Sequence, residues 1–317
     1  MRFSYRSPVP GNFVPTKIFT LVFPVVLTVV SSASAQPSSL RAASRPVVLF
    51  IHGRGFGGLP EDSVRTAWLG AFEEGQKSIG FAGLRTDQDV RLVWYGSSSM
   101  HYNCRTQLSA LNTDRRSILQ RIAEIVARLP GVEQRIGEAV FQDTQAYFSD
   151  GCYRGQVDNE LREELERAKI EKRPIVLVAH SMGSLVALSV LTQEWVPTED
   201  ESVALITIGS MLGMEEMPKA LLGSYVESPV PVPQVVTHWM NVRNDGDLLS
   251  FSTVGRFRSR VQARIPVDVP IKARGASRHS AETYLRDPAF ANIVADSWCD
   301  AFPLISDRPS ECSRARR

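Results

Sequence analysis

Short apolar runs rich in β-branched residues recur along the chain, and they constrain its fold more than any other feature. None of them alternates polar with apolar residues, which is the pattern of strands buried on both faces of a parallel sheet. Helical patterns separate several of the runs, and this alternation favours an α/β fold with a doubly wound, mostly parallel sheet. The runs are residues 47–51, 90–95, 175–179, 203–208 and 235–242.

The interval between the second and third runs is too long for one crossover helix. Apolar residues at helical spacing predict a helix over residues 114–129, and a charged, exposed helix is predicted over residues 158–170. We therefore expect residues 97–155 to form a helical cap insertion over the edge of the sheet. Cys104 and Cys152 stand near its two ends, where a disulfide would tie its base together.

The first 35 residues have the composition of a cleaved signal peptide. Three basic residues and no acidic ones precede or flank an apolar segment at 18–30, and Ala-Ser-Ala at 33–35 fits a cleavage site. The alternative is an uncleaved membrane anchor, but 13 apolar residues interrupted by Pro24 fall short of the ~20 that span a bilayer. We predict a secreted or periplasmic protein whose single domain covers residues 36–317 and ends in a polar tail at 303–317.

The net charge of the chain argues against nucleic acid as a partner. The whole sequence carries +2, but without residues 1–35 its 33 basic residues face 34 acidic ones, a net charge of −1. The excess of basic residues therefore belongs to the leader, and no basic surface for nucleic acid is indicated.

Four cysteines follow the leader, and an even number in an exported chain predicts disulfides. Among the three possible connectivities we favour pairing of nearest neighbours, Cys104–Cys152 and Cys299–Cys312. The chain contains no Cys-x-x-Cys sequence, so a zinc site or redox motif has little support. We expect neither a metal nor a cofactor.

The third apolar run leads directly into Ala-His-Ser-Met-Gly at 179–183, which has the form of a strand, a sharp turn and a helix. Such a turn presents a nucleophilic serine when the residues two before and two after it are small. Ala179 stands where glycine is usual and adds one methyl group, whereas Gly183 keeps the other side open. The backbone N–H of Met182 can donate to an oxyanion. Alternatively, Ser181 is only a helix N-cap.

The first run ends in His52-Gly53-Arg54 and continues into a glycine-rich segment. A buried strand that ends in His-Gly resembles the oxyanion loop of α/β-hydrolases, in which the N–H after the glycine, here that of Arg54, is the second donor. Residues 53–58 also satisfy G-x-G-x-x-G, the pattern of dinucleotide-binding folds. Against that alternative, the glycines and Pro60 delay the next helix to about residue 61, and the next run ends without an acid to hold a ribose.

Chain order limits the choice of base, because the serine of an α/β-hydrolase triad precedes the acid and the acid precedes the histidine. Only His238 and His279 follow Ser181. His238 lies inside the fifth run, where a histidine is more often a core residue, whereas His279 occupies a polar loop ahead of a predicted helix. His279 is the predicted base, and His180 is expected to point away from the serine hydroxyl.

The acid is expected on the loop after the fifth run, which reads Asn-Asp-Gly-Asp-Leu-Leu at 244–249. Asp245 and Asp247 are both candidates. Asp245 precedes a glycine and can simply cap the turn. Asp247 precedes two leucines that can anchor it beneath the imidazole, so Asp247 is favoured.

These residues together predict acyl transfer by a Ser-His-Asp triad. His279 removes the proton from Ser181, Asp247 orients and stabilises the imidazole, and the N–H groups of Met182 and Arg54 bind the oxyanion. We expect a serine hydrolase of carboxylic esters, lipid esters included, that contacts a membrane only through such a lipid substrate. An acyltransferase or thioesterase would use the same triad, and a non-catalytic binding protein would show no reactivity at Ser181. The sequence does not indicate an oligomeric state.

Five segments appear in an order that resembles the α/β-hydrolase superfamily, and within it the serine esterase and lipase-like families related to GPI-inositol deacylases. They are "VVLFIHGRG", "VLVAHSMGSLVA", "ITIGSMLGM", "WMNVRNDGDLL" and "RHSAETY", within residues 46–290. The resemblance implies an α/β-hydrolase fold and places the triad on Ser181, Asp247 and His279. Ala179 and Met211 depart from the family pattern, and the cap insertion has no counterpart in it, which leaves the substrate open.

Overall fold

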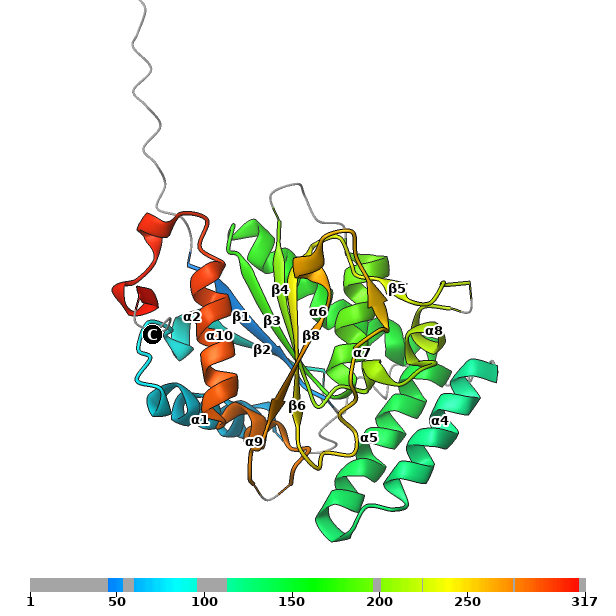
Figure 1. Cartoon of the computed structure of the whole chain (residues 1–317). Helices are drawn as coiled ribbons and strands as arrows, with labels where there is room; N and C mark the ends of the chain where they lie inside the picture. The colour runs from blue at the N-terminus through cyan, green and yellow to red at the C-terminus, as the bar shows by residue number, and fades with distance from the viewer. Residues whose placement is uncertain are drawn as a thin grey trace, which may run out of the picture. The chain divides into compact units, whose positions relative to one another are not determined.

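Six parallel strands form the central sheet of the protein in a computed structural model (Figure 1). The structure describes residues 45–53, 60–95, 113–195, 201–223, 225–275 and 277–313, all of which belong to one compact unit, Ala42–Arg317. In spatial order the strands are β2 (Val90–Val93), β1 (Val47–Ile51), β3 (Ile175–His180), β4 (Val203–Ile208), β6 (Val236–Asn244) and β8 (Val267–Ile271).

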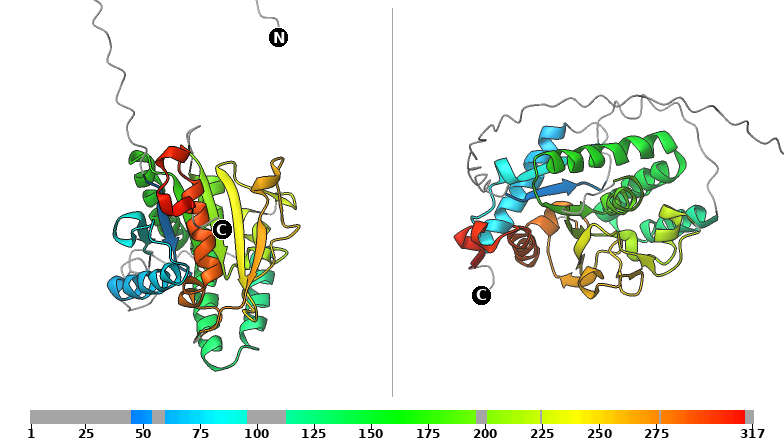
Figure 2. Two further views of the ribbon diagram at one scale, coloured as in Figure 1. Left: turned by 60° about the vertical axis from the view of Figure 1, so that its left-hand side comes forward. Right: turned by 90° about the horizontal axis from the view of Figure 1, so that it is seen from above.

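Side chains of successive strand residues pack on opposite faces of this sheet, and each face has its own hydrophobic core. Val47, Leu49 and Ile51 of β1 join one core, and Val48 and Phe50 join the other. Helices cover both faces (Figure 2). One face carries α6 (Gly151–Ile170), α7 (Met182–Ser189) and α8 (Met217–Leu222), and the other carries α1 (Glu61–Ser78), α9 (Ala281–Leu285) and α10 (Pro288–Asp300). The predicted doubly wound α/β architecture is therefore confirmed.

The five predicted strands are all present, and their ends differ from the prediction by at most two residues. The sixth strand, β8, was not predicted, because its sequence Val-Asp-Val-Pro-Ile contains no apolar run and most of its residues are partly or fully exposed. Pairing with β8 also extends β6 to Asn244, beyond the predicted end of that run. A separate pair of short parallel strands consists of β5 (Val230–Pro231) and β7 (Phe257–Arg258).

The described part of the predicted cap insertion is helical. Its helices are α4 (Thr113–Val126) and α5 (Gly131–Ser149), which lie side by side and extend past one end of the sheet (Figures 1 and 2). The predicted face of α4 is buried at Ile118, Leu119 and Ile122. The predicted upper boundary of the insertion, about residue 155, lies inside α6.

The prediction of an exposed helix over residues 158–170 is wrong in its first residue and in its exposure. The helix α6 begins seven residues earlier, at Gly151, where the Asp150 carboxylate accepts hydrogen bonds from two backbone N–H groups of its first turn. Val157, Leu161 and Leu165 form a buried stripe between charged flanks, at the spacing of one helix face. The high charge of the segment conceals this narrow stripe.

The remaining described elements are short. They are α2 (Thr86–Asp89), a π-helix η1 (Val190–Glu194), and four 3-10 turns, η2 (Met211–Gly213), η3 (Gln262–Arg264), η4 (Ile305–Asp307) and η5 (Ser310–Ser313). Within the part of the chain that the structure describes, no helix is long and apolar enough to cross a membrane. The predicted signal peptide lies outside the described residues.

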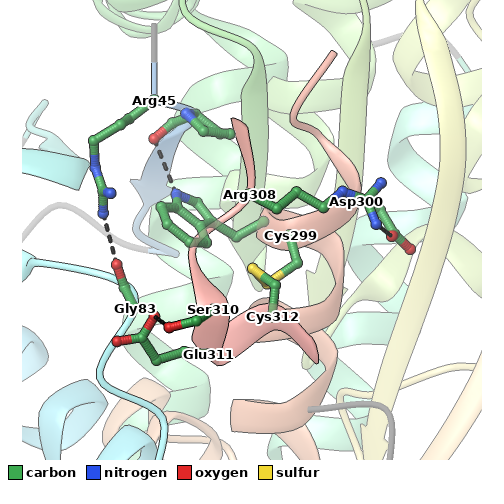
Figure 3. The surroundings of a disulfide bond; sticks show 10 residues. Arg45, Gly83, Cys299, Asp300, Arg308, Ser310, Glu311 and Cys312 are labelled. Carbon is green, nitrogen blue, oxygen red and sulfur yellow. Dashed lines mark hydrogen bonds and ion pairs between the residues drawn. A yellow bond between two sulfur atoms is a disulfide. The ribbon is translucent and has the colours of Figure 1, made fainter. Parts of the chain in front are cut away.

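A disulfide between Cys299 and Cys312 holds the C-terminal tail against α10, as predicted (Figure 3). The same region contacts the start of the described chain, since Trp298 donates its indole N–H to the carbonyl of Pro46 at 3.0 Å. The guanidinium of Arg45 lies over the Trp298 ring and donates to the carbonyl of Gly83. The predicted Cys104–Cys152 bridge is not tested, because Cys104 lies outside the described residues.

Replacing Cys312 by serine should destabilise the fold. The disulfide spans a sequence separation of 13 residues, for which the lost chain constraint corresponds to about 3 kcal/mol. Urea unfolding should show a lower midpoint for Cys312→Ser than for the control Ser313→Ala in the same turn. Equal midpoints for the two variants would contradict a stabilising tail.

Candidate active site

Ser181 lies at the turn between β3 and α7 in a strained backbone conformation. Its φ is +53° and its ψ is −122°, a region that residues other than glycine rarely adopt and that costs of order 1–3 kcal/mol. Its N–H donates to the carbonyl of Ile208 at the end of β4, at 3.0 Å. The serine side chain makes no cap hydrogen bond to α7, so the alternative that Ser181 is an ordinary helix N-cap does not describe this turn.

Close packing around the turn explains the small residues in its sequence. A Cβ on Gly183 would lie 2.7 Å from the carbonyl oxygens of Ile51 and His52, and one on Gly53 would lie 2.4 Å from the Ser181 Cβ. Ala179 is wholly buried inside β3, between Ile51 and Thr207 on the neighbouring strands. Of the two small residues that flank Ser181 in the motif, Gly183 therefore has no room for a Cβ, whereas the alanine at 179 fits within the strand.

The three predicted triad residues meet at this turn. The Ser181 Oγ lies 2.9 Å from Nε2 of His279, and Nδ1 of His279 lies 2.9 and 3.0 Å from the two carboxylate oxygens of Asp247. Because a carboxylate only accepts hydrogen bonds, Nδ1 carries the proton and Nε2 of the neutral ring is free to accept from the serine hydroxyl. All three side chains are buried.

Asp247 is held as a carboxylate by its surroundings. Burial acts to raise the pKa of Asp247, but the His279 imidazole, the Tyr284 hydroxyl and the Leu249 N–H outweigh it and lower the pKa below its ordinary value. Tyr284 donates to the second carboxylate oxygen at 2.6 Å. Burial and the neighbouring Asp247 raise the pKa of Tyr284 well above its ordinary value, so the tyrosine stays a neutral donor.

Of the two leucines that follow Asp247, only Leu249 supports it as predicted. Leu249 is buried and its N–H donates to Asp247 at 3.0 Å, whereas Leu248 is 53% exposed. The competing acid, Asp245, is exposed and is held through its backbone by β8 and Arg278. The choice of Asp247 over Asp245 agrees with this geometry.

A buried polar network contacts the loop that carries Asp247. Thr207 of β4 donates to the side chain of Asn241 at 2.8 Å and accepts the indole N–H of Trp239 at 3.0 Å. Asn241 in turn donates to the carbonyl of Phe251, beyond the acid, and to Asp268 of β8. The segments "ITIGSMLGM" and "WMNVRNDGDLL" therefore supply support residues around the acid as well as the acid itself.

Gly209 is needed where β4 ends beside the His279–Asp247 pair. Its φ is +56°, and a Cβ there would lie 3.2 to 3.3 Å from ring atoms of His279 and from the Asp247 carboxylate. The next residue, Ser210, shares a hydrogen bond with Ser184 of α7 at 2.8 Å. The end of β4 thus contacts the helix that follows the serine as well as the acid–base pair.

The remaining described histidines have other partners. His180 donates from Nε2 to the carbonyl oxygen of His279 at 2.8 Å, so it contacts the backbone of His279 rather than the serine hydroxyl. His52 accepts the N–H of Tyr95 and stacks on its ring. His238 lies 3.2 Å from the Ser297 hydroxyl, and burial lowers its pKa. Sequence reasoning missed the roles of His180 and Tyr284, although Tyr284 lies within the quoted segment "RHSAETY".

One of the two predicted oxyanion donors lies at the turn. Met182 is the first residue of α7, where backbone N–H groups have no partner within the helix. Arg54 lies outside the described residues.

The late helix start that argued against dinucleotide binding is confirmed, since α1 begins at Glu61.

A pocket of ≈ 200 Å³ adjoins the triad. Gly53, which touches Ser181, and His279 line one side of it, while Trp68 of α1 and Ile136 and Val140 of α5 form apolar walls. In the part of the chain that is described, no group of three or more acidic, histidine or cysteine side chains could hold a metal ion. The arrangement can support proton transfer from a buried serine hydroxyl next to a largely apolar pocket.

Comparison with known proteins adds no family assignment. No protein-family model matches the chain, and no curated protein matches its sequence.

Replacing Gly183 by alanine should destabilise the protein by about 1–3 kcal/mol, because the new methyl group would collide with two backbone carbonyls. Gly155→Ala in α6 is the matched control. Nothing lies within 4 Å of a Cβ at that position, so the control should gain roughly 0.5–1 kcal/mol from lower chain entropy. Urea unfolding of both variants measures the difference, and a Gly183→Ala variant as stable as the control would contradict the crowded turn.

Proposed function

We propose that the protein is a serine hydrolase of the α/β-hydrolase fold that cleaves carboxylic esters through an acyl-enzyme. The observation that carries the proposal is the continuous hydrogen-bonded chain from the Ser181 hydroxyl through His279 to Asp247. A strained serine between a parallel strand and a helix, with a positive φ, supports the same assignment.

The donors and acceptors of the three side chains suit the proton transfers of acyl transfer. Nε2 of His279 takes the Ser181 proton as Oγ attacks the ester carbonyl, and the imidazolium then donates that proton to the departing alcohol. Asp247 stabilises the imidazolium, because its lowered pKa keeps it ionised. A water molecule repeats the sequence on the acyl-enzyme and releases the acid.

The oxyanion of each tetrahedral intermediate would form beside the start of α7. The Met182 N–H is one donor, and the Arg54 N–H is proposed as the second. Each donor of this kind is worth roughly 3 kcal/mol of transition-state stabilisation where it has been probed. Both would act beside a buried serine, where such hydrogen bonds are worth more than they are in water.

The pocket favours an apolar group on the substrate. Trp68, Ile136 and Val140 provide its walls, and Glu282 is the acidic residue among the described residues that line it. A carboxylate at that place disfavours an anionic substrate. We propose uncharged carboxylic esters, lipid esters included, as the substrate class. Export to an oxidising compartment is part of the proposal, supported by the disulfide and the leader-like sequence.

Labelling with a fluorophosphonate probe should modify Ser181 in the wild-type protein, because the probe reacts with a serine activated by a neighbouring base. Mass spectrometry of the labelled peptide locates the site. Ser181→Ala should lose all label, whereas Ser306→Ala, in the exposed turn η4, should keep it. Label that persists in Ser181→Ala would refute the assignment of the nucleophile.

Hydrolysis of p-nitrophenyl esters should separate the two candidate bases. His279→Ala should lower kcat by about 10⁴-fold or more, as loss of the base of a triad does. His238→Ala should leave kcat within about twofold, because that ring contacts Ser297 in α10 and lies away from the triad. A larger loss in His238→Ala than in His279→Ala would show that the base has been misassigned.

A further inference from the structure

The backbone of His279 is held from both sides. Its carbonyl oxygen accepts a hydrogen bond from His180, and its N–H donates to the hydroxyl of Ser277 at 3.2 Å. Ser277 is itself 2% exposed. The Ser277 hydroxyl donates in turn to Oε2 of Glu133 at 2.7 Å, and the N–H of Arg278 donates to Oε1 of the same carboxylate at 2.6 Å.

Glu133 reaches this loop from the cap insertion, 144 residues earlier in the chain than Ser277. An acidic residue in the first turn of a helix often serves the helix itself, through the macrodipole or a capping box. Here the N-cap of α5 is Pro130, which has no N–H that could donate a hydrogen bond to a glutamate. Both carboxylate oxygens are instead used by the loop that carries the predicted base.

The face of α5 that carries Glu133 also forms the wall of the pocket. Glu133, Ile136 and Val140 follow one another at the i, i+3 and i+7 spacing of a single helix face. Ile136 and Val140 line the pocket. The same face therefore contacts the space for the substrate and the backbone beside His279.

The far end of α5 is fixed to the helix that follows Ser181. Tyr147 donates its hydroxyl to the buried carboxylate of Asp158 in α6, and Ser189 at the end of α7 donates to the same carboxylate. Arg115 of α4 donates to the carbonyl of Phe148. The helix thus spans from an anchor behind the serine to the loop of the histidine.

We infer that Glu133 is a positioning residue for His279, acting through Ser277 and the Arg278 backbone. This inference rests on the proposed function. The carboxylate sets the backbone from which the imidazole projects, so the distance from Nε2 to the serine hydroxyl depends on it. A misplacement of about 1 Å in such a contact can lower the rate about 100-fold.

The bonding requirement at Glu133 predicts a graded effect of substitution. Both of its partners, the Ser277 O–H and the Arg278 N–H, are donors. A glutamine offers a single oxygen and would turn its NH₂ group toward one of them. Only the Ser277 hydroxyl can rotate to accept it, so Glu133→Gln keeps part of the arrangement and Glu133→Ala keeps none.

Steady-state kinetics on p-nitrophenyl esters with the full chain test the inference. For Glu133→Ala we expect kcat to fall by about 10- to 100-fold with KM changed less than about threefold, and Glu133→Gln should lie between that variant and wild type. Active-site titration should show the same fraction of reactive serine in all variants. The matched control is Glu138→Gln, farther along α5, whose exposed carboxylate accepts a hydrogen bond from Gln134 of the same helix. It should match wild type.

Two outcomes would overturn the inference. The first is a kcat for Glu133→Ala equal to that of Glu138→Gln. The second is an increase in KM with kcat unchanged, which would mean that Glu133 only holds the pocket wall. If Glu133→Ala fails to fold, Ser277→Ala replaces it. That variant removes the hydroxyl between Glu133 and the His279 N–H but leaves the hydrogen bond from the Arg278 N–H to Glu133. A kcat for Ser277→Ala equal to wild type would then overturn it.

The wild-type protein separates this inference from the proposed function. If wild type neither hydrolyses the esters nor takes the fluorophosphonate label, the proposed function fails and Glu133 has no base to position. If wild type is active and labelled while Glu133→Ala keeps the kcat of wild type, the proposed function stands and the inference fails.

Discussion

The strained backbone of Ser181 is the constraint on which the site depends. Its positive φ is retained because the ends of β1 and β4 close on it from two sides: Gly53 lies against the serine Cβ, and Ile208 accepts its N–H. Since β3 lies between β1 and β4 in a fully parallel sheet, the loops after all three strands emerge at the same edge. Gly53 then approaches from the β1 side, and Asp247 and His279 approach from the side of β4, β6 and β8.

Keeping the acid in place requires polar groups inside the sheet. Thr207 and Asn241 are wholly buried, yet their hydroxyl and amide groups have hydrogen-bond partners in the network with Trp239 and Asp268. A buried network of this kind specifies one arrangement, because leaving any member unpaired is costly in a low-dielectric interior. The acid loop is therefore held by the sheet that carries it and by Tyr284 above it.

The sequence predicted the parts of the molecule that depend on local pattern and chain order. Strands buried on both faces are visible as apolar runs, and the order of serine, acid and histidine selected Ser181, Asp247 and His279, which the fold brings together. The edge strand β8 and the buried stripe of α6 were missed, because exposed and charged neighbours obscure their patterns. Contacts between distant segments, such as Glu133 with Ser277 or Tyr284 with Asp247, have no local signature at all.

The position of α5 links the shape of the pocket to the acid–base pair. A helix of 19 residues is about 28 Å long at 1.5 Å per residue, and here its two ends contact the loop of His279 and the network behind α7. A change at Ile136 or Val140 that displaced the helix would also displace Glu133, because the three side chains share one face. The volume of the pocket and the contact with the loop of His279 are therefore coupled through one helix, so a shift of α5 that changes one would also change the other.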